Sequence, residues 1–126
     1  NSNFARAEIQ FRLGVSLYRE GKTEEALALF QKIKRGGEAF KAHVLSFIGR
    51  CLVELEMYDV AYSKLSEIDV DNPELPEERR HSLHYWLGRA AEGEGKSPEA
   101  RKHYRKILAS DVNFRDVARR IEELEE

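Results

Sequence analysis

The chain has 126 residues, 41% hydrophobic and 35% charged, so it is long enough for one domain with a single core and too apolar for a disordered chain. Its 21 basic and 23 acidic residues give a formal net charge of −2, a balance that argues against a dedicated nucleic-acid-binding protein. One cysteine cannot form an internal disulfide, and no apolar run reaches the ~20 residues that a membrane span requires.

The first half of the sequence predicts four helices, because apolar residues recur at helical spacing between glycine and proline breaks. Leu13 and Leu17 are expected on one inward face of the first helix. Thr23 is the expected N-cap of the second helix, which stops at the Gly36–Gly37 pair. The four helices are expected over about residues 4–20, 23–36, 38–54 and 58–72.

Three more helices are expected in the second half, over about residues 76–94, 97–107 and 114–123. Pro76 opens the first of them, because proline is favoured in the first turn of a helix. Ser97 is the expected N-cap of the next. The last helix is apolar along one face only, which is typical of the unit that closes a solenoid. Its apolar residues are Phe114, Val117, Ala118, Ile121 and Leu124.

One arrangement of small and bulky residues occurs three times. A glycine is followed 12 residues later by an alanine, then after four residues by a bulky apolar residue, and after three more by an isoleucine. A fixed internal register of this kind marks a repeat protein, and repeat arrays generally act as binding surfaces. The three sets are Gly14, Ala26, Phe30 and Ile33; Gly49, Ala61, Leu65 and Ile68; and Gly88, Ala100, Tyr104 and Ile107.

This register resembles the tetratricopeptide repeat, a helix–turn–helix unit of 34 residues. The Leu-Gly pair of the family pattern is matched at residues 13–14 and 87–88 and by Ile-Gly at 48–49, and Pro73 matches its closing proline. The resemblance implies an all-α fold, a right-handed α-solenoid of three hairpins with a C-terminal cap helix, as a single domain over residues 1–126.

The resemblance also gives the expected bounds of the units. The repeats cover about residues 7–40, 42–75 and 81–114, and the cap helix covers about 114–125. The second linker is longer than the first by about five residues, in the segment 73–80. We expect a longer loop or an extended helix start there.

In this family the first helices of successive hairpins line a concave groove. The resemblance therefore implies a protein–protein interaction module that is not an enzyme and needs no cofactor. Arg50 and Arg89 lie one repeat apart, and a guanidinium can pair with a carboxylate or phosphate and stack on rings. We expect a groove for an extended or helical peptide with acidic and apolar side chains; the alternative is that both arginines are solvated surface residues. The expected groove residues are Phe11, Val15, Tyr18, Ser46, Arg50, Val53, Tyr85, Arg89 and Glu92.

One subclass of the family clamps the C-terminal carboxylate of chaperone tails with a set of Lys, Asn and Arg residues. The matching positions in this chain hold Phe11, Val15, Phe47, Ser82 and Trp86. None of these side chains offers the required charge or amide group, so the sequence argues against that function.

Other residues with reactive side chains are expected to be structural. His81 and His84 lie three apart on one expected helix, and His103 is the candidate third ligand, but a metal site usually needs a fourth. Cys51 stands at a place that the family fills with a small residue, so we expect it in the core. No metal site is therefore expected.

Three alternatives stay open: a self-association or assembly unit, a regulatory appendage of a larger multidomain protein, and a metal-dependent enzyme that uses the histidines. Phe4, Ile9 and Phe11 are expected on an N-terminal face that could support a homo-oligomer. The chain begins with Asn1, which suggests a fragment of a longer protein. The composition favours a soluble, cytoplasmic protein, with the compartment itself unknown.

Overall fold

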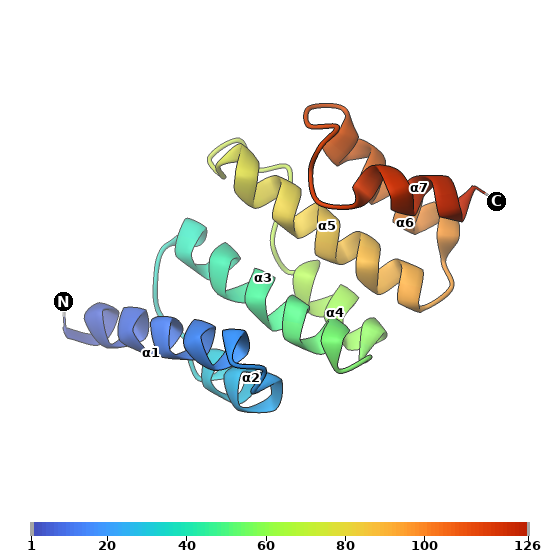
Figure 1. Ribbon diagram of the computed structural model, residues 1–126. Helices are drawn as coiled ribbons and strands as arrows, with labels where there is room; N and C mark the ends of the chain where they lie inside the picture. The colour runs from blue at the N-terminus through green and yellow to red at the C-terminus, as the bar shows by residue number, and fades with distance from the viewer. Residues whose placement is uncertain (1, 126) are drawn as a thin grey trace.

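The computed structural model describes residues 2–125, and within them it contains seven α-helices and no strand (Figure 1). The helices form three hairpins, α1–α2, α3–α4 and α5–α6, stacked side by side, and α7 packs on α6. The all-α solenoid predicted from the repeat register is confirmed. The helices are α1 Ser2–Arg19, α2 Thr23–Gln31, α3 Glu38–Glu54, α4 Tyr58–Leu65, α5 Glu77–Gly93, α6 Ser97–Leu108 and α7 Val117–Leu124.

Each hairpin is closed by a contact between a glycine of its first helix and a bulky side chain of its second. A Cβ atom on Gly14 would meet the ring of Phe30, and one on Gly88 would meet the ring of Tyr104. Phe30 and Tyr104 are fully buried, at 0% exposure. The two helices can approach closely only because the first one carries no side chain at this position.

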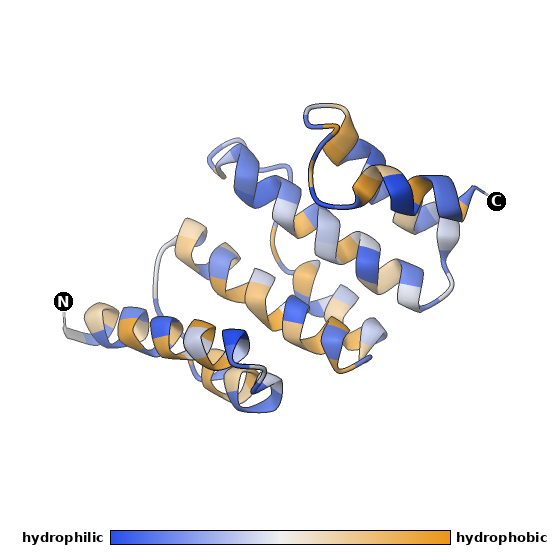
Figure 2. Ribbon diagram, viewed as in Figure 1, coloured by the Kyte–Doolittle hydropathy of each residue, from blue (hydrophilic) through white to orange (hydrophobic). Residues whose placement is uncertain are grey.

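The core is one continuous cluster, and α3 and α5 at its centre contribute most of its buried residues. Figure 2 shows α3 coloured mainly as hydrophobic, whereas α5 shows more of the polar colours. A central helix contacts neighbours on both sides, so more of its circumference is removed from water than on a terminal helix. On α1 the difference is plain, because Leu13, expected to face inward, is 53% exposed.

Two helices are shorter than the apolar spacing predicts. The second and fourth helices end at Gln31 and Leu65, several residues before the predicted ends near residues 36 and 72. Ile33 and Ile68 lie beyond these ends but still pack against the core. The helical spacing of buried residues therefore continues into a turn, and the periodicity alone overstates the helix length.

The turns of the three hairpins share one backbone conformation. The residue at the centre of each turn has a positive φ, which is 84° at Gly21, 60° at Glu56 and 77° at Gly95. L-residues with a Cβ atom adopt this region at a cost, which glycine avoids. Glu56 is thus a strained residue at a position that suits glycine.

The expected N-caps of two helices are wrong by one residue. Thr23 and Ser97 are the first residues of α2 and α6, and the caps are Lys22 and Lys96, whose side chains make no capping hydrogen bond. The Thr23 hydroxyl instead donates to a carboxylate oxygen of Glu54 over 3.4 Å.

Candidate functional site

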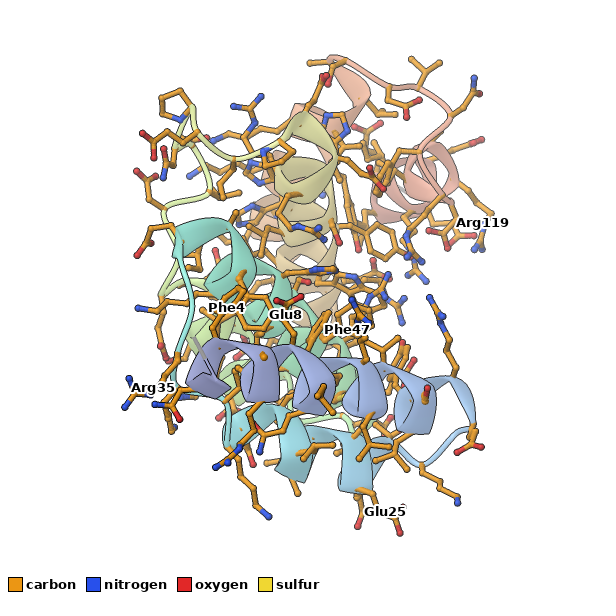
Figure 3. The ribbon with its side chains drawn as sticks, turned by 90° about the vertical axis from the view of Figure 1, so that its left-hand side faces the viewer. Phe4, Glu8, Glu25, Arg35, Phe47 and Arg119 are labelled. Carbon is orange, nitrogen blue, oxygen red and sulfur yellow. The ribbon has the colours of Figure 1, made fainter. Side chains whose placement is uncertain are left out.

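The inner face of the solenoid, formed by α1, α3 and α5, carries a pocket between α3, α5 and the loop before α7. Its volume is about 330 Å³. In Figure 3, Phe47 lies near the middle of the molecule, whereas Arg119 and Arg35 lie towards opposite sides. We call this cavity the inner-face pocket; its lining comprises His43, Ser46, Phe47 and Arg50 of α3, Glu78, Arg79 and Ser82 of α5, and Phe114 and Arg115 of the loop.

Arg50 is the central cation of this face. Its guanidinium carbon lies 4.7 Å from the ring centre of Phe47, 5.1 Å from that of Trp86 and 5.9 Å from that of Tyr18. These rings belong to three successive hairpins, so a single arginine joins them by cation–π contacts. Burial lowers the pKa of Arg50, and the positive charge of Arg115 lowers it further.

Trp86 lies beneath three guanidinium groups. The guanidinium carbons of Arg89 and Arg115 are each 5.5 Å from its ring centre, close to the distance for Arg50. The ring is 4% exposed, and its Nε1 atom is buried without a hydrogen-bond partner among the described residues. We call Arg50, Arg89 and Arg115 the arginine cluster.

The acidic side chains of the inner face are engaged by other residues. Oε1 of Glu54 accepts a hydrogen bond of 2.7 Å from the Tyr18 hydroxyl. Glu92 accepts one from the Tyr104 hydroxyl at 2.8 Å and forms an ion pair of 3.0 Å with Arg120. These carboxylates therefore have partners of their own.

Asp116 anchors the start of α7 to the neighbouring hairpin. It accepts hydrogen bonds from the Tyr85 hydroxyl at 2.8 Å and from Nε of Arg120 at 3.0 Å. Burial on its own would raise the pKa of Asp116, but these two hydrogen bonds outweigh it and lower the pKa. The arginine cluster, in contrast, forms no ion pair among the residues that the structure describes.

The comparisons with known proteins agree with this architecture. A tetratricopeptide repeat family model matches residues 8–35, the part of the chain that holds the first hairpin. The fold is similar to the NMR structure of the first TPR domain of the human RPAP3 protein, with a TM-score of 0.79, 18% sequence identity, and coverage of 94% of this chain and 89% of that one. Residues 8–35 therefore match one tetratricopeptide repeat, and the chain as a whole has the fold of a TPR domain. A comparison with curated proteins finds no match.

The tetratricopeptide repeat brings together some of the predicted groove residues and buries others. Tyr18 and Arg50 are in contact, as are Tyr85 and Arg89, since a guanidinium nitrogen of Arg89 donates to the Tyr85 hydroxyl over 3.3 Å. Phe11, Val15, Tyr18, Arg50, Arg89 and Glu92 are half-buried. Ser46, Val53 and Tyr85 are 1%, 2% and 3% exposed, so these three belong to the core more than to the surface of the groove.

Sequence reasoning missed two cations of this site, Arg79 and Arg115. Arg79 lies in the first turn of α5, where the repeat pattern specifies no groove residue. Arg115 lies in the loop before α7 with a φ of 44°, outside every repeat. No spacing rule of the tetratricopeptide repeat points to either residue; only the folded chain brings them to the pocket.

The three candidate metal ligands do not converge in this repeat protein. His84 and His103 are neighbours, with 3.0 Å between their Nδ1 atoms, and Nε2 of His103 is 2.9 Å from the Tyr62 hydroxyl. His81 contacts Ser110 instead, at 2.7 Å. Across residues 2–125, no group of three or more His, Cys, Asp or Glu side chains is arranged to hold a metal ion.

Burial decides the protonation of the reactive side chains in the core. It lowers the pKa of both His84 and His103 to about 4, assisted at His84 by the proximity of His103. Burial also raises the pKa of the Cys51 thiol to about 12. Both imidazoles are therefore neutral near pH 7, and Cys51 is a thiol rather than a nucleophilic thiolate.

A membrane span would require a longer and more apolar helix than any in the part of the chain that the structure describes.

Proposed function

We propose that this domain is a protein–protein interaction module whose inner face binds an extended segment of a partner protein that carries acidic side chains. The tetratricopeptide repeat is in general a protein-binding fold, which supports the broader statement. The finer statement rests on the arginine cluster. Three guanidinium groups surround one buried indole without a carboxylate partner, so they are available to an external anion.

The aromatic surface beside the cluster supports the apolar part of the same proposal. The Phe11 ring lies 5.5 Å from that of Phe47 and 4.6 Å from the imidazole of His43. These rings form a partly exposed path along α1 and α3 that leads to Arg50. A segment with alternating apolar and acidic side chains would bury apolar area against the rings and pair its carboxylates with the arginines.

The test is charge reversal at the two groove arginines. The double variant Arg50→Glu/Arg89→Glu should bind a pool of acidic peptides at least tenfold more weakly than the wild type, measured by fluorescence anisotropy. A matched control is Lys34→Glu/Arg35→Glu, which makes the same change in net charge at two exposed residues outside the inner face. Equal loss of binding in both double variants would show that only net charge matters and would refute the groove.

Self-association is the second candidate, because α1 exposes apolar side chains. Ile9 and Leu13 are 66% and 53% exposed and lie one helical turn apart. The N-terminal face expected from the sequence is only partly correct, since the rings of Phe4 and Phe11 each lie 5.6 Å from the ring of Phe40 and so face the second hairpin. Sedimentation of Ile9→Lys beside the wild type tests whether Ile9 and Leu13 hold two copies together.

A further inference from the structure

The side chains that line the inner-face pocket carry more positive than negative charge. Arg50, Arg79 and Arg115 line it, and Glu78 supplies one carboxylate. His43 is neutral near pH 7, because burial and then the charges of Arg79 and Arg50 lower its pKa to about 4. Three guanidinium groups and one carboxylate leave the lining with an excess of positive charge, which the Glu54 carboxylate near Arg50 offsets in part.

These arginines come from three different elements, and the charges of Arg50 and Arg115 repel each other. Arg50 lies on α3, Arg79 on α5 and Arg115 in the loop before α7. Burial lowers the pKa of Arg79, as it does that of Arg50. None of the three forms an ion pair among the described residues. A doubly charged anion would relieve this repulsion.

Among the described residues, one buried donor of the pocket lining and one on a neighbouring residue outside the lining have no acceptor. Nε of Arg50 and Nε1 of Trp86 are the buried side-chain polar atoms without a hydrogen-bond partner among the residues that the structure describes. An unsatisfied buried donor costs about 1–3 kcal/mol. An anion with three or more acceptor oxygens can therefore form more hydrogen bonds here than a carboxylate, which has two oxygens. Ser82 adds a hydroxyl to the lining.

The size and walls of the pocket limit what can enter it. A volume of about 330 Å³ is at the lower end of the range of ligand sites, roughly 300–1,000 Å³. It admits one charged group and its linker, and it is small for a nucleotide. The Phe47 and Phe114 rings form apolar walls beside the cations, which suits a side chain that reaches the pocket from a bound peptide.

We propose that the inner-face pocket binds a phosphorylated side chain of the partner segment, with Arg50, Arg79 and Arg115 pairing with the phosphate oxygens. The inference rests on the proposed function, because the segment is the one held by the inner face. A phosphate monoester carries a charge close to −2 at pH 7 and three acceptor oxygens, which match the excess of positive charge and the forked guanidinium donors. A carboxylate would offset less of that excess.

The experiment compares three degenerate peptide pools that differ only in a fixed central phosphoserine, glutamate or serine. Binding is measured by anisotropy and by the fluorescence of Trp86, which is the one tryptophan of the chain and lies under the arginine cluster. We expect the phosphoserine pool to bind at least tenfold more tightly than the glutamate pool. Arg79→Gln and Arg115→Gln should each abolish that difference, whereas the exposed control Arg105→Gln should retain it.

The outcomes separate the two proposals. Equal affinity for the phosphoserine and glutamate pools, both above the serine pool, would overturn the phosphate inference and leave the acidic groove intact. No binding of any pool would overturn both. Titration with inorganic phosphate separates the sources of the anion, since free phosphate that binds as tightly as the phosphoserine pool would show an ion site in place of a peptide site. Circular dichroism confirms that each variant is folded.

Discussion

Glu56 occupies, in the turn of the second hairpin, the position that Gly21 occupies in the first, with φ of 60° at Glu56 and 84° at Gly21. Replacement of Glu56 by glycine removes the strain of a left-handed backbone conformation, and this relief stabilises the fold by roughly 1–2 kcal/mol. The larger conformational entropy that glycine loses on folding offsets part of this gain. We expect Glu56→Gly to raise the free energy of unfolding by about 0.5–1 kcal/mol, measured by urea denaturation. The reverse change, Gly21→Glu, should lower it; a Glu56→Gly variant less stable than the wild type would contradict the strain.

Gly49 should tolerate no side chain. A Cβ atom there would lie 2.5 Å from Leu65 Cδ2 and 2.6 Å from its Cγ, and Leu65 is fully buried. Gly49→Ala should therefore destabilise the domain by about 1–3 kcal/mol through overpacking, despite the better helix propensity of alanine. The matched control is Gly37→Ala, where no atom lies within 4 Å of the added Cβ. Equal melting temperatures for the two variants would show that the hairpin is loosely packed.

The repeat register predicted the hairpins because its residues make the decisive contacts inside them. The register assigns Gly88 to the first helix and Tyr104 to the second helix of one hairpin, and the structure brings these two residues into contact. The helix ends were less predictable. Ile33 and Ile68 are half-buried in segments that follow the helix ends and continue the helical spacing, so periodicity could not show where the backbone stops being helical.

Repeat positions predicted the surface position of only some of the expected groove residues. Repeat positions identify the first helices of the hairpins, but α3 and α5 are covered on both sides, which buries Ser46, Val53 and Tyr85. Arg115 could not be predicted at all. It belongs to a loop, and the path of a loop depends on tertiary contacts such as the one between Asp116 and Tyr85.

The stability of the domain should fall as the pH is lowered from about 6.5 to about 4. Burial lowers the pKa of His43, His84 and His103 to about 4, from an ordinary value of 6.5. In this window the unfolded chain binds more protons than the folded one, so acid favours unfolding. We expect the free energy of unfolding to be about 2–4 kcal/mol lower at pH 5 than at pH 7, measured by urea denaturation at both values.

A variant isolates this effect from the titration of other groups. His84→Phe removes one of the two buried imidazoles and keeps an aromatic ring in its place. The loss of stability between pH 7 and pH 5 should be smaller in this variant by about a third, because His43 and His103 keep their lowered pKa values. An unchanged pH dependence would mean that His84 is not one of its sources.

Arg120 should hold α7 in place more than any exposed ion pair does. Its side chain is 17% exposed and pairs with Glu92 and Asp116, each at 3.0 Å. Arg120→Gln leaves Glu92 without its cation and leaves Asp116 with Arg119 as its remaining cation, and we expect a loss of about 1–3 kcal/mol. Hydrogen exchange of the α7 amides should become faster.

The control for α7 is Arg105→Gln, which breaks an ion pair with Glu125 whose side chains are 60% and 49% exposed. A pair of this kind contributes about 0–1 kcal/mol, so exchange in α7 should change little. If both variants accelerated exchange to the same extent, the anchoring role of Arg120 would be wrong.

The position of Arg115 has a consequence for stoichiometry. Arg50 and Arg89 occupy one repeated position, which holds Val15 in the first hairpin, so a cation at that position can recur from hairpin to hairpin. Arg115 lies in a segment that no hairpin duplicates, and the pocket that it completes is therefore present once, however many hairpins are stacked before it. A partner with several modified sites would gather several copies of this domain along its length rather than wind through a single one.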